Sequence, residues 1–276
     1  MTAVVSTLLA SDGLTLVRRS FVPAGAVRGA VAIHHGFGEH GGLVAEAGEA
    51  LAAAGFLAAV HDARGHGRTP GPRGHVRAWS ELRDDLGTQL ARLREEAPGK
   101  PLFLLGDSLG GLVVLDFALR HPDGLAGVVA VGPAVGATGV PAWTMALGRL
   151  LSRVWPVFGL DARLDLTNLS RDPERARAIV EDPLYHTHGT ARLSTEFEAT
   201  KRELLRRVGE LRVPVLVMQG TADRIVSPAD TRNFFERIRV TDRELKIYEG
   251  AVHNLLHDTN HAEVVAAIVA WLRARS

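Results

Sequence analysis

The chain has 276 residues, 46% of them hydrophobic, which is enough for one large α/β domain with an insertion or for two small domains. Its 32 basic and 31 acidic residues leave a net charge of +1, so its charge does not favour binding to nucleic acid or to an anionic membrane surface. Cysteine is absent, which excludes disulfides and thiolate metal sites.

The N-terminus, residues 1–10, lacks the basic start of a signal peptide, and its apolar run is short. No stretch of the sequence approaches the length of a membrane span. We therefore expect a cytoplasmic protein without a transmembrane segment, whose oligomeric state the sequence does not indicate.

Short apolar runs alternate with helical patterns along most of the chain, which is typical of a mostly parallel sheet flanked by helices. The expected strands lie at 3–9, 14–22, 30–34, 56–61, 101–105, 125–131, 213–218 and 244–248. The expected helices lie at 43–54, 80–96, 112–120, 229–238 and 261–273.

Between residues 133 and 195 this alternation stops, and a mostly helical pattern without a strand-like run replaces it. We interpret 133–195 as a helical cap inserted into a core formed by 1–132 and 196–276. Large apolar residues of the cap are expected to line an acyl or aromatic pocket, although each of them would serve equally well in simple packing. They are Trp143, Met145, Leu147, Trp155 and Phe158. The candidate hinge for a lid movement comprises Gly136, Gly139 and Pro141.

The segment Gly106-Asp107-Ser108-Leu109-Gly110 has the pattern G-x-S-x-G between an apolar strand and a helix. This context predicts a nucleophile elbow, in which glycine is needed because a neighbouring Cβ would collide with the strand or the helix. The Ser108 hydroxyl would then project at a helix N-terminus, where free backbone N–H groups stabilise negative charge. The alternative is an ordinary glycine-rich turn with a solvated serine.

A serine hydroxyl needs a base to take its proton, and the base needs a carboxylate to fix its tautomer. In elbow-type hydrolases these partners follow in the order serine, acid, histidine, each after a later strand. Asp223 and His253 stand in these places, after the strands at 213–218 and 244–248. Asp230 and His257 are the competing residues.

An oxyanion hole is expected from two backbone N–H groups. One belongs to Leu109, directly after the serine, and the other to Phe37, in the loop after the strand at 30–34.

Two patterns point to other chemistry. The loop at 36–41 spells G-x-G-x-x-G, and Asp62 ends the next strand, which together form the fingerprint of an NAD-dependent oxidoreductase. Histidines at 34, 35, 40, 61 and 66 suggest a metal, but their spacing fits neither H-x-H-x-D-H nor H-E-x-x-H, so we expect structural histidines and no metal.

The chain resembles the monoacylglycerol lipase and lysophospholipase group of the α/β-hydrolase superfamily over nearly its whole length. The resemblance is carried by the motifs at 35–40, 62–68, 106–111, 182–184 and 220–223 and by His253. It implies an α/β-hydrolase fold, a triad of Ser108, Asp223 and His253, an oxyanion hole at Phe37 and Leu109, and no cofactor.

Two positions depart from the family pattern. Asp107 replaces the usual histidine before the nucleophile, and Leu43-Val44 replace an arginine and a tyrosine at the headgroup end of the family's site. A carboxylate at 107 would oppose oxyanion formation unless its surroundings compensate.

The sequence therefore predicts a serine hydrolase that cleaves carboxylic esters, such as monoacylglycerols, lysophospholipids or small acyl esters, through an acyl-enzyme. A carboxylesterase or acyltransferase on a non-glyceride ester is the alternative. An NAD-dependent oxidoreductase and a non-catalytic ligand receptor are further alternatives.

Overall fold

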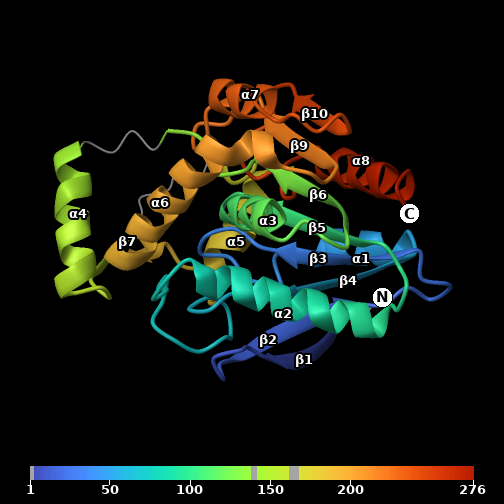
Figure 1. Cartoon of the computed structure of the whole chain (residues 1–276), viewed down its shortest axis with the longest axis horizontal. Coiled ribbons are helices and arrows are strands. Elements are labelled where there is room, and N and C mark those ends of the chain that lie inside the picture. Colours follow the sequence, from blue (N-terminus) through green and yellow to red (C-terminus); the bar gives the residue numbers. More distant parts are fainter. Residues whose placement is uncertain (1–2, 138–141, 162–167) are drawn as a thin grey trace.

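The computed structural model describes residues 3–137, 142–161 and 168–276, and eight strands within these ranges form one sheet (Figure 1). They are ordered β1-β2-β4-β3-β5-β6-β9-β10. Strand β2 is antiparallel to both of its neighbours, and all other pairs are parallel. The strands are β1 (Val4–Leu9), β2 (Thr15–Phe21), β3 (Gly29–His34), β4 (Phe56–His61), β5 (Leu102–Asp107), β6 (Leu125–Val131), β9 (Val215–Gly220) and β10 (Arg243–Tyr248).

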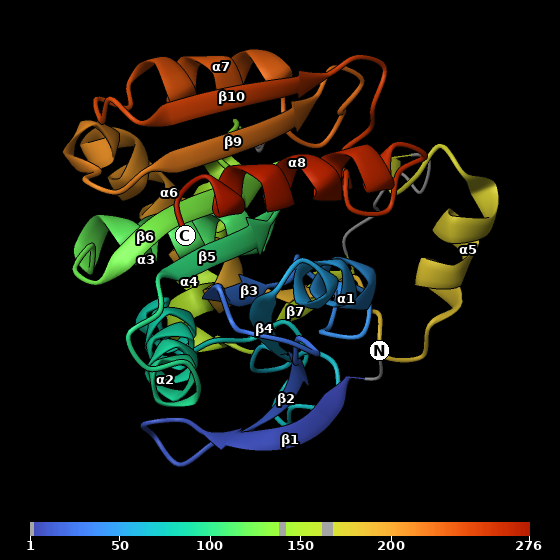
Figure 2. The same ribbon diagram turned by 90° about the vertical axis from the view of Figure 1, so that its right-hand side faces the viewer.

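Helices cover both faces of the sheet, as the sequence predicts. Strands β3, β4 and β5 are buried throughout, which explains why they read as continuous apolar runs. One hydrophobic cluster joins the sheet to α1 (Ala45–Ala53) and α8 (His261–Arg273). The cluster on the other face includes residues of α2 (Ser80–Glu96), α3 (Leu109–Arg120), α6 (Ala191–Arg207) and α7 (Pro228–Glu236). Figures 1 and 2 show α2 and α8 on opposite sides of the sheet.

The segment between β6 and α6 contains α4 (Ala142–Val154), β7 (Gly159–Asp161), α5 (Pro173–Glu181) and β8 (His188–Thr190). Strands β7 and β8 form a separate antiparallel pair, so the expectation of no strand here is wrong. Three-residue strands carry too little alternation to be recognised in a sequence. Helix α6 begins at Ala191 and continues past residue 195, where we had expected the cap to end. A short 3₁₀ turn, η2 (Val208–Glu210), follows α6.

Helix α4 packs against α6 through polar groups. The buried Ser152 hydroxyl bonds to Thr195, 2.8 Å away, and its carbonyl accepts from Arg192 at 2.7 Å. The apolar stripe of α4 faces outward instead, and Trp143 is 72% exposed. Figure 1 shows α4 standing at the edge of the molecule, away from the sheet.

The chain from the end of α5 through β8 is hydrogen-bonded to two loops of the core. The His186 N–H donates to the Gly38 carbonyl at 3.0 Å, and the Thr190 N–H donates to the Gly74 carbonyl at 3.1 Å. Gly38 has a φ of +75°, and a Cβ there would lie 1.9 Å from the His186 carbonyl oxygen. Glycine at 38 is therefore required for this close approach. Among the described helices, none combines the length and apolar character needed to cross a bilayer.

Four of the five histidines singled out in the sequence are buried together beneath the loops after β3 and β4. They are His34, His35, His61 and His66. Burial lowers the pKa of His34 and His61 to about 4, and burial with the neighbouring His186 lowers that of His66 to about 3. These imidazoles are therefore neutral at pH 7. The fifth, His40, lies 3.1 Å from the Asp182 carboxylate.

We expect the protein to lose stability as the pH falls from about 6.5 toward 4. In this range the histidines are protonated in the unfolded chain but stay neutral in the folded protein, so protons favour the unfolded state. Each such histidine contributes a slope of up to about 1.4 kcal/mol per pH unit. Urea unfolding at pH 7, 6 and 5 measures this slope, and equal free energies of unfolding at these pH values would contradict it.

Candidate active site

The turn between β5 and α3 has the strained geometry of a nucleophile elbow. Ser108 has a φ of +50°, and it is the one non-glycine residue with positive φ among those described. A Cβ on Gly106 would lie 2.2 Å from the Gly110 carbonyl oxygen, and one on Gly110 would lie 2.1 Å from that of His34. Glycine at both positions is therefore what lets the chain reverse here. The strain at Ser108 is held by the buried strand β5 and by α3, in which every residue except Arg120 is buried.

Three side chains from distant parts of the chain form a hydrogen-bonded row at the carboxyl edge of the sheet. The Ser108 Oγ lies 2.8 Å from His253 Nε2, and His253 Nδ1 lies 2.7 Å from Asp223 Oδ2. Because an ionised carboxylate only accepts hydrogen bonds, Nδ1 carries the proton and Nε2 is free to accept from the serine hydroxyl. The structure thus brings together the serine, acid and histidine selected from the sequence.

The Asp223 carboxylate is fixed from several sides. Its Oδ1 accepts the N–H groups of Ile225 and Val226, and its Oδ2 also accepts the Gln219 side-chain amide at 2.7 Å. Burial works to raise the pKa of Asp223, but the His253 bond and these N–H donors outweigh it, so the pKa lies below its usual range. The carboxylate is therefore ionised at neutral pH and held in a single orientation.

The two competing residues have other partners. Asp230 lies on α7 and accepts the Ala137 N–H at 2.9 Å. The His257 ring is buried, which lowers its pKa, and its carbonyl accepts the Ser170 hydroxyl. Neither has a described hydrogen bond to Ser108 or His253.

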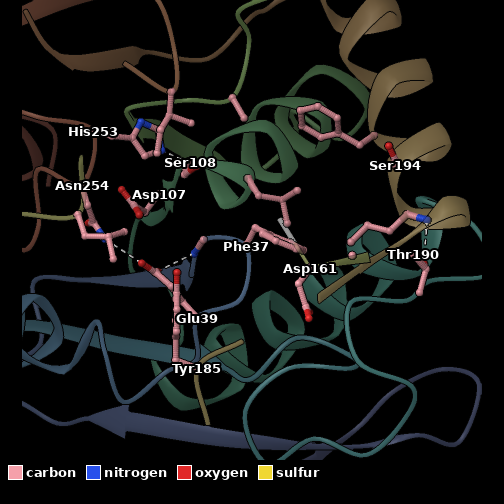
Figure 3. A pocket seen from close by; sticks show the side chains of 18 of the residues that line it. Phe37, Glu39, Asp107, Ser108, Asp161, Tyr185, Thr190, Ser194, His253 and Asn254 are labelled. Atoms are coloured by element: carbon pink, nitrogen blue, oxygen red, sulfur yellow. Dashed lines mark hydrogen bonds between the residues drawn. The ribbon is translucent and has the colours of Figure 1, made fainter. Parts of the chain in front are cut away.

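A cavity of about 380 Å³ opens over Ser108 and His253 (Figure 3). Most of its wall is apolar, and both Phe37 and Leu109 contribute to it. The remaining apolar lining comes from Ala134, Leu160, Leu169, Leu193, Phe197 and Ile225. Strands β7 and β8 and helix α6 thus form one side of the cavity, and the elbow and the loop after β3 form the other.

The five cap residues that we expected to line the pocket do not line this cavity. Trp143, Leu147 and Trp155 are exposed, because α4 contacts α6 through Ser152 and turns its apolar stripe to solvent. Met145 and Phe158 are half-buried away from it. Of the expected hinge, Gly136 is described, whereas Gly139 and Pro141 lie outside the described residues.

One corner of the cavity is polar. Glu39, Asp107, Tyr185 and Asn254 lie together there, as the left side of Figure 3 shows. Glu39 Oε1 accepts the Asn254 side-chain amide at 2.8 Å, and Oε2 accepts the Gly36 N–H at 3.0 Å. The sequence did not predict Glu39, Tyr185 or Asn254 as site residues. Glu39 stands inside a quoted motif, and Asn254 follows His253 directly, but nothing in the sequence pairs them.

The glycine-rich loop at 36–41 contacts other parts of the protein. The Asp62 carboxylate accepts the Gly41 N–H at 2.8 Å and pairs with Arg19 at 2.6 Å, so it is already engaged by the fold. The chain at His186 packs on Gly38. In the described part of the chain, no group of three or more His, Asp or Glu side chains is placed to hold a metal ion.

Comparison with known proteins places these features in one family. The family model described as serine aminopeptidase, S33, matches residues 25–260. A monoacylglycerol lipase from Mycolicibacterium smegmatis is 32% identical over 94% of this chain and 93% of its own length. The human monoglyceride lipase is 31% identical, over 90% of this chain and 82% of its own.

The fold is shared with solved structures as well. The crystal structure of a monoacylglycerol lipase from Paleococcus ferrophilus superposes with a TM-score of 0.87 at 35% identity, covering 95% of this chain and 99% of that one. This confirms the expected α/β-hydrolase fold and the resemblance from which we inferred it.

We expect Gly110→Ala to destabilise the protein by more than about 3 kcal/mol, because the new Cβ meets the His34 carbonyl in a fully buried turn. Gly148→Ala in α4 is the matched control, since nothing lies within 4 Å of a Cβ there. That change should stabilise by about 0.5–1 kcal/mol. Thermal unfolding of the two variants measures both effects, and an equally stable Gly110→Ala protein would contradict the steric account.

Proposed function

Because this chain belongs to the serine aminopeptidase S33 family of α/β-hydrolases and is a serine ester hydrolase, we propose that Ser108, His253 and Asp223 carry out the cleavage. The observation that supports this assignment is the unbroken row of hydrogen bonds from Asp223 through His253 to the Ser108 hydroxyl, at the floor of the cavity.

In acylation, Ser108 Oγ attacks the carbonyl carbon of the ester, and His253 Nε2 takes the hydroxyl proton. The bond from that carbon to the alcohol oxygen then breaks, and His253 returns the proton to the departing alcohol. Asp223 stabilises the imidazolium that forms between these steps and keeps the ring in place. Water repeats the attack on the acyl-enzyme with the same base, which releases the acid and restores the serine.

The backbone N–H groups of Phe37 and Leu109 are the proposed oxyanion hole. Leu109 is the first residue of α3, where N–H groups have no partner within the helix, and both residues line the cavity beside Ser108. One such donor is worth about 2.7–4 kcal/mol of transition-state stabilisation in other hydrolases.

The cavity supports a substrate with one apolar and one polar part. Its apolar wall suits an acyl chain, and the polar corner at Glu39, Tyr185 and Asn254 suits an alcohol that carries hydroxyl groups. Relatives at 31–32% identity are named monoacylglycerol and monoglyceride lipases. We therefore propose esters of the monoacylglycerol kind as substrates, and residues 133–195 as the cap that closes over them.

Ser108→Ala is expected to lower turnover of a monoacylglycerol by about 10⁶-fold, as loss of a triad serine does elsewhere, while thermal unfolding stays close to that of the parent. Hydrolysis is followed by the acid released. A fluorophosphonate probe provides the second measurement, since it should label the parent at Ser108 and leave the variant unlabelled. Turnover within tenfold of the parent would remove Ser108 from the mechanism.

Filling the cavity should shorten the acyl chain that the enzyme accepts. Ser194 lines the cavity from α6, and Ser194→Trp should reduce kcat/KM for a twelve-carbon ester by at least about tenfold relative to a four-carbon one, which is worth about 1.4 kcal/mol. Ala199→Trp is the control, because Ala199 is exposed on the same helix and does not line the cavity. Identical chain-length profiles for both variants would place the acyl site elsewhere.

A further inference from the structure

Two carboxyl groups meet behind the nucleophile, one from the loop after β3 and one from the end of β5. A methyl group built on Gly36 would lie 3.1 Å from Glu39 Oε2 and 3.3 Å from Asp107 Oδ2, so both oxygens border the same point. Both side chains are buried and both line the cavity. Two like charges that border one point in a buried site strongly oppose each other.

The hydrogen bonds favour a negative charge on Glu39 over one on Asp107. Glu39 accepts N–H groups at both oxygens, from Asn254 and Gly36, which is the arrangement of an ionised carboxylate. Asp107 Oδ1 is fully buried and has no hydrogen-bond partner among the residues that the structure describes. A bare carboxylate in that position would be strongly disfavoured, whereas a neutral acid is tolerated.

Catalysis adds a further constraint, because Ser108 directly follows Asp107. The proposed mechanism already places the Asp223 carboxylate and a developing oxyanion at this site, balanced by one imidazolium at His253. An ionised Asp107 would add a negative charge next to the nucleophile, and among the described residues no ion pair to Asp107 offsets it. An uncharged residue 107 therefore favours the reaction.

We propose that Asp107 works as a neutral carboxylic acid, kept so by Glu39, and that it donates a hydrogen bond from its hydroxyl to the alcohol part of the ester in the polar corner of the cavity. This inference rests on the proposed function and assigns to Asp107 a role in substrate contact and in the pH range of activity. Asp107 takes the place of the histidine usual in the family, so the family pattern does not supply this role.

The groups around Asp107 agree with this protonation state. Burial, then Glu39, then Asp223, raise the pKa of Asp107 well above its ordinary value. Burial and Glu39 raise the pKa of Tyr185 to about 12, so its phenol stays protonated up to pH 9.5. His253, which the mechanism uses as the base, is a further titratable residue of the same cavity wall.

The protonation state of Asp107 is tested first by the pH dependence of thermal stability. An acid protonated in the folded state and ionised when unfolded destabilises the protein progressively as the pH rises from about 4. Asp107→Asn has the same shape and cannot ionise, so its melting temperature should rise relative to the parent between pH 4 and 7. Asp84→Asn, at an exposed position of α2, is the control and should show a constant difference. A constant difference for Asp107→Asn as well would overturn the proposal.

The catalytic role is tested by the pH dependence of kcat/KM with glyceryl monobutyrate, between pH 5.5 and 9.5 and corrected for uncatalysed hydrolysis. Where the parent and Asp84→Asn lose activity on the alkaline side, by about tenfold per pH unit when one proton is lost, Asp107→Asn should keep its plateau to a higher pH. A parent that keeps its plateau to pH 9.5 would agree with an acid that stays neutral over this range. A variant whose activity falls in parallel with that of the parent would overturn the assignment.

Contact with the alcohol is tested by comparing glyceryl monobutyrate with ethyl butyrate, which lacks the hydroxyl groups. Asp107→Ala should reduce the preference for the glyceryl ester by about 2- to 10-fold, the usual effect of one neutral hydrogen bond, and Asp107→Asn should retain more of it. An unchanged preference in Asp107→Ala would refute the contact. Fluorophosphonate labelling of Ser108 in every variant separates these outcomes from failure of the proposed function, which would abolish labelling in the parent too.

Discussion

The two hydrogen bonds of the His253 imidazole form only when three separate parts of the fold are correctly placed, because each of the three residues that they join is positioned by a different part. Ser108 is positioned by the turn from β5 into α3, Asp223 by the loop after β9, and His253 by the loop after β10. Strands β5 and β9 lie on either side of β6, so their carboxyl ends meet at one edge of the sheet. The parallel arrangement is thus what converts distant sequence positions into one site.

The site also depends on which of its buried side chains are charged and on what stabilises those charges. The imidazoles buried beneath the loops after β3 and β4 are neutral, and the Asp62 charge is compensated by Arg19. Near the nucleophile, negative charge is stabilised differently, because Asp223 and Glu39 accept hydrogen bonds from N–H donors and are not paired with a cation among the described residues. Negative charge there is held by dipoles, which leaves the one mobile positive charge to form on His253 during the reaction.

The elbow and the alternation of strands and helices were predictable, because they depend on residues that are close together in the sequence. The elbow is recognisable because Gly106 and Gly110 each lack room for a Cβ, and this requirement leaves a fixed pattern in the sequence. The acid and the base were selected because each follows a strand, the buried β9 before Asp223 and the half-buried β10 before His253. The lining of the cavity was not predictable, since the apolar stripe of α4 looks the same in sequence whether it faces a cavity or solvent. The contact through Ser152 decides its direction, and a lone serine in an amphipathic helix gives no signal.

The polar corner marks the limit of sequence reasoning most clearly. Glu39 and Asn254 are separated by more than two hundred positions and form one hydrogen bond. Asp107 was noticed only as a departure from a family pattern, with a charge that would oppose the chemistry. In three dimensions Glu39 holds both nearby donors, so Asp107 is left without one and stays neutral. The same carboxyl group is therefore harmful or useful according to how its neighbours distribute their N–H groups, and that distribution exists only in the folded chain.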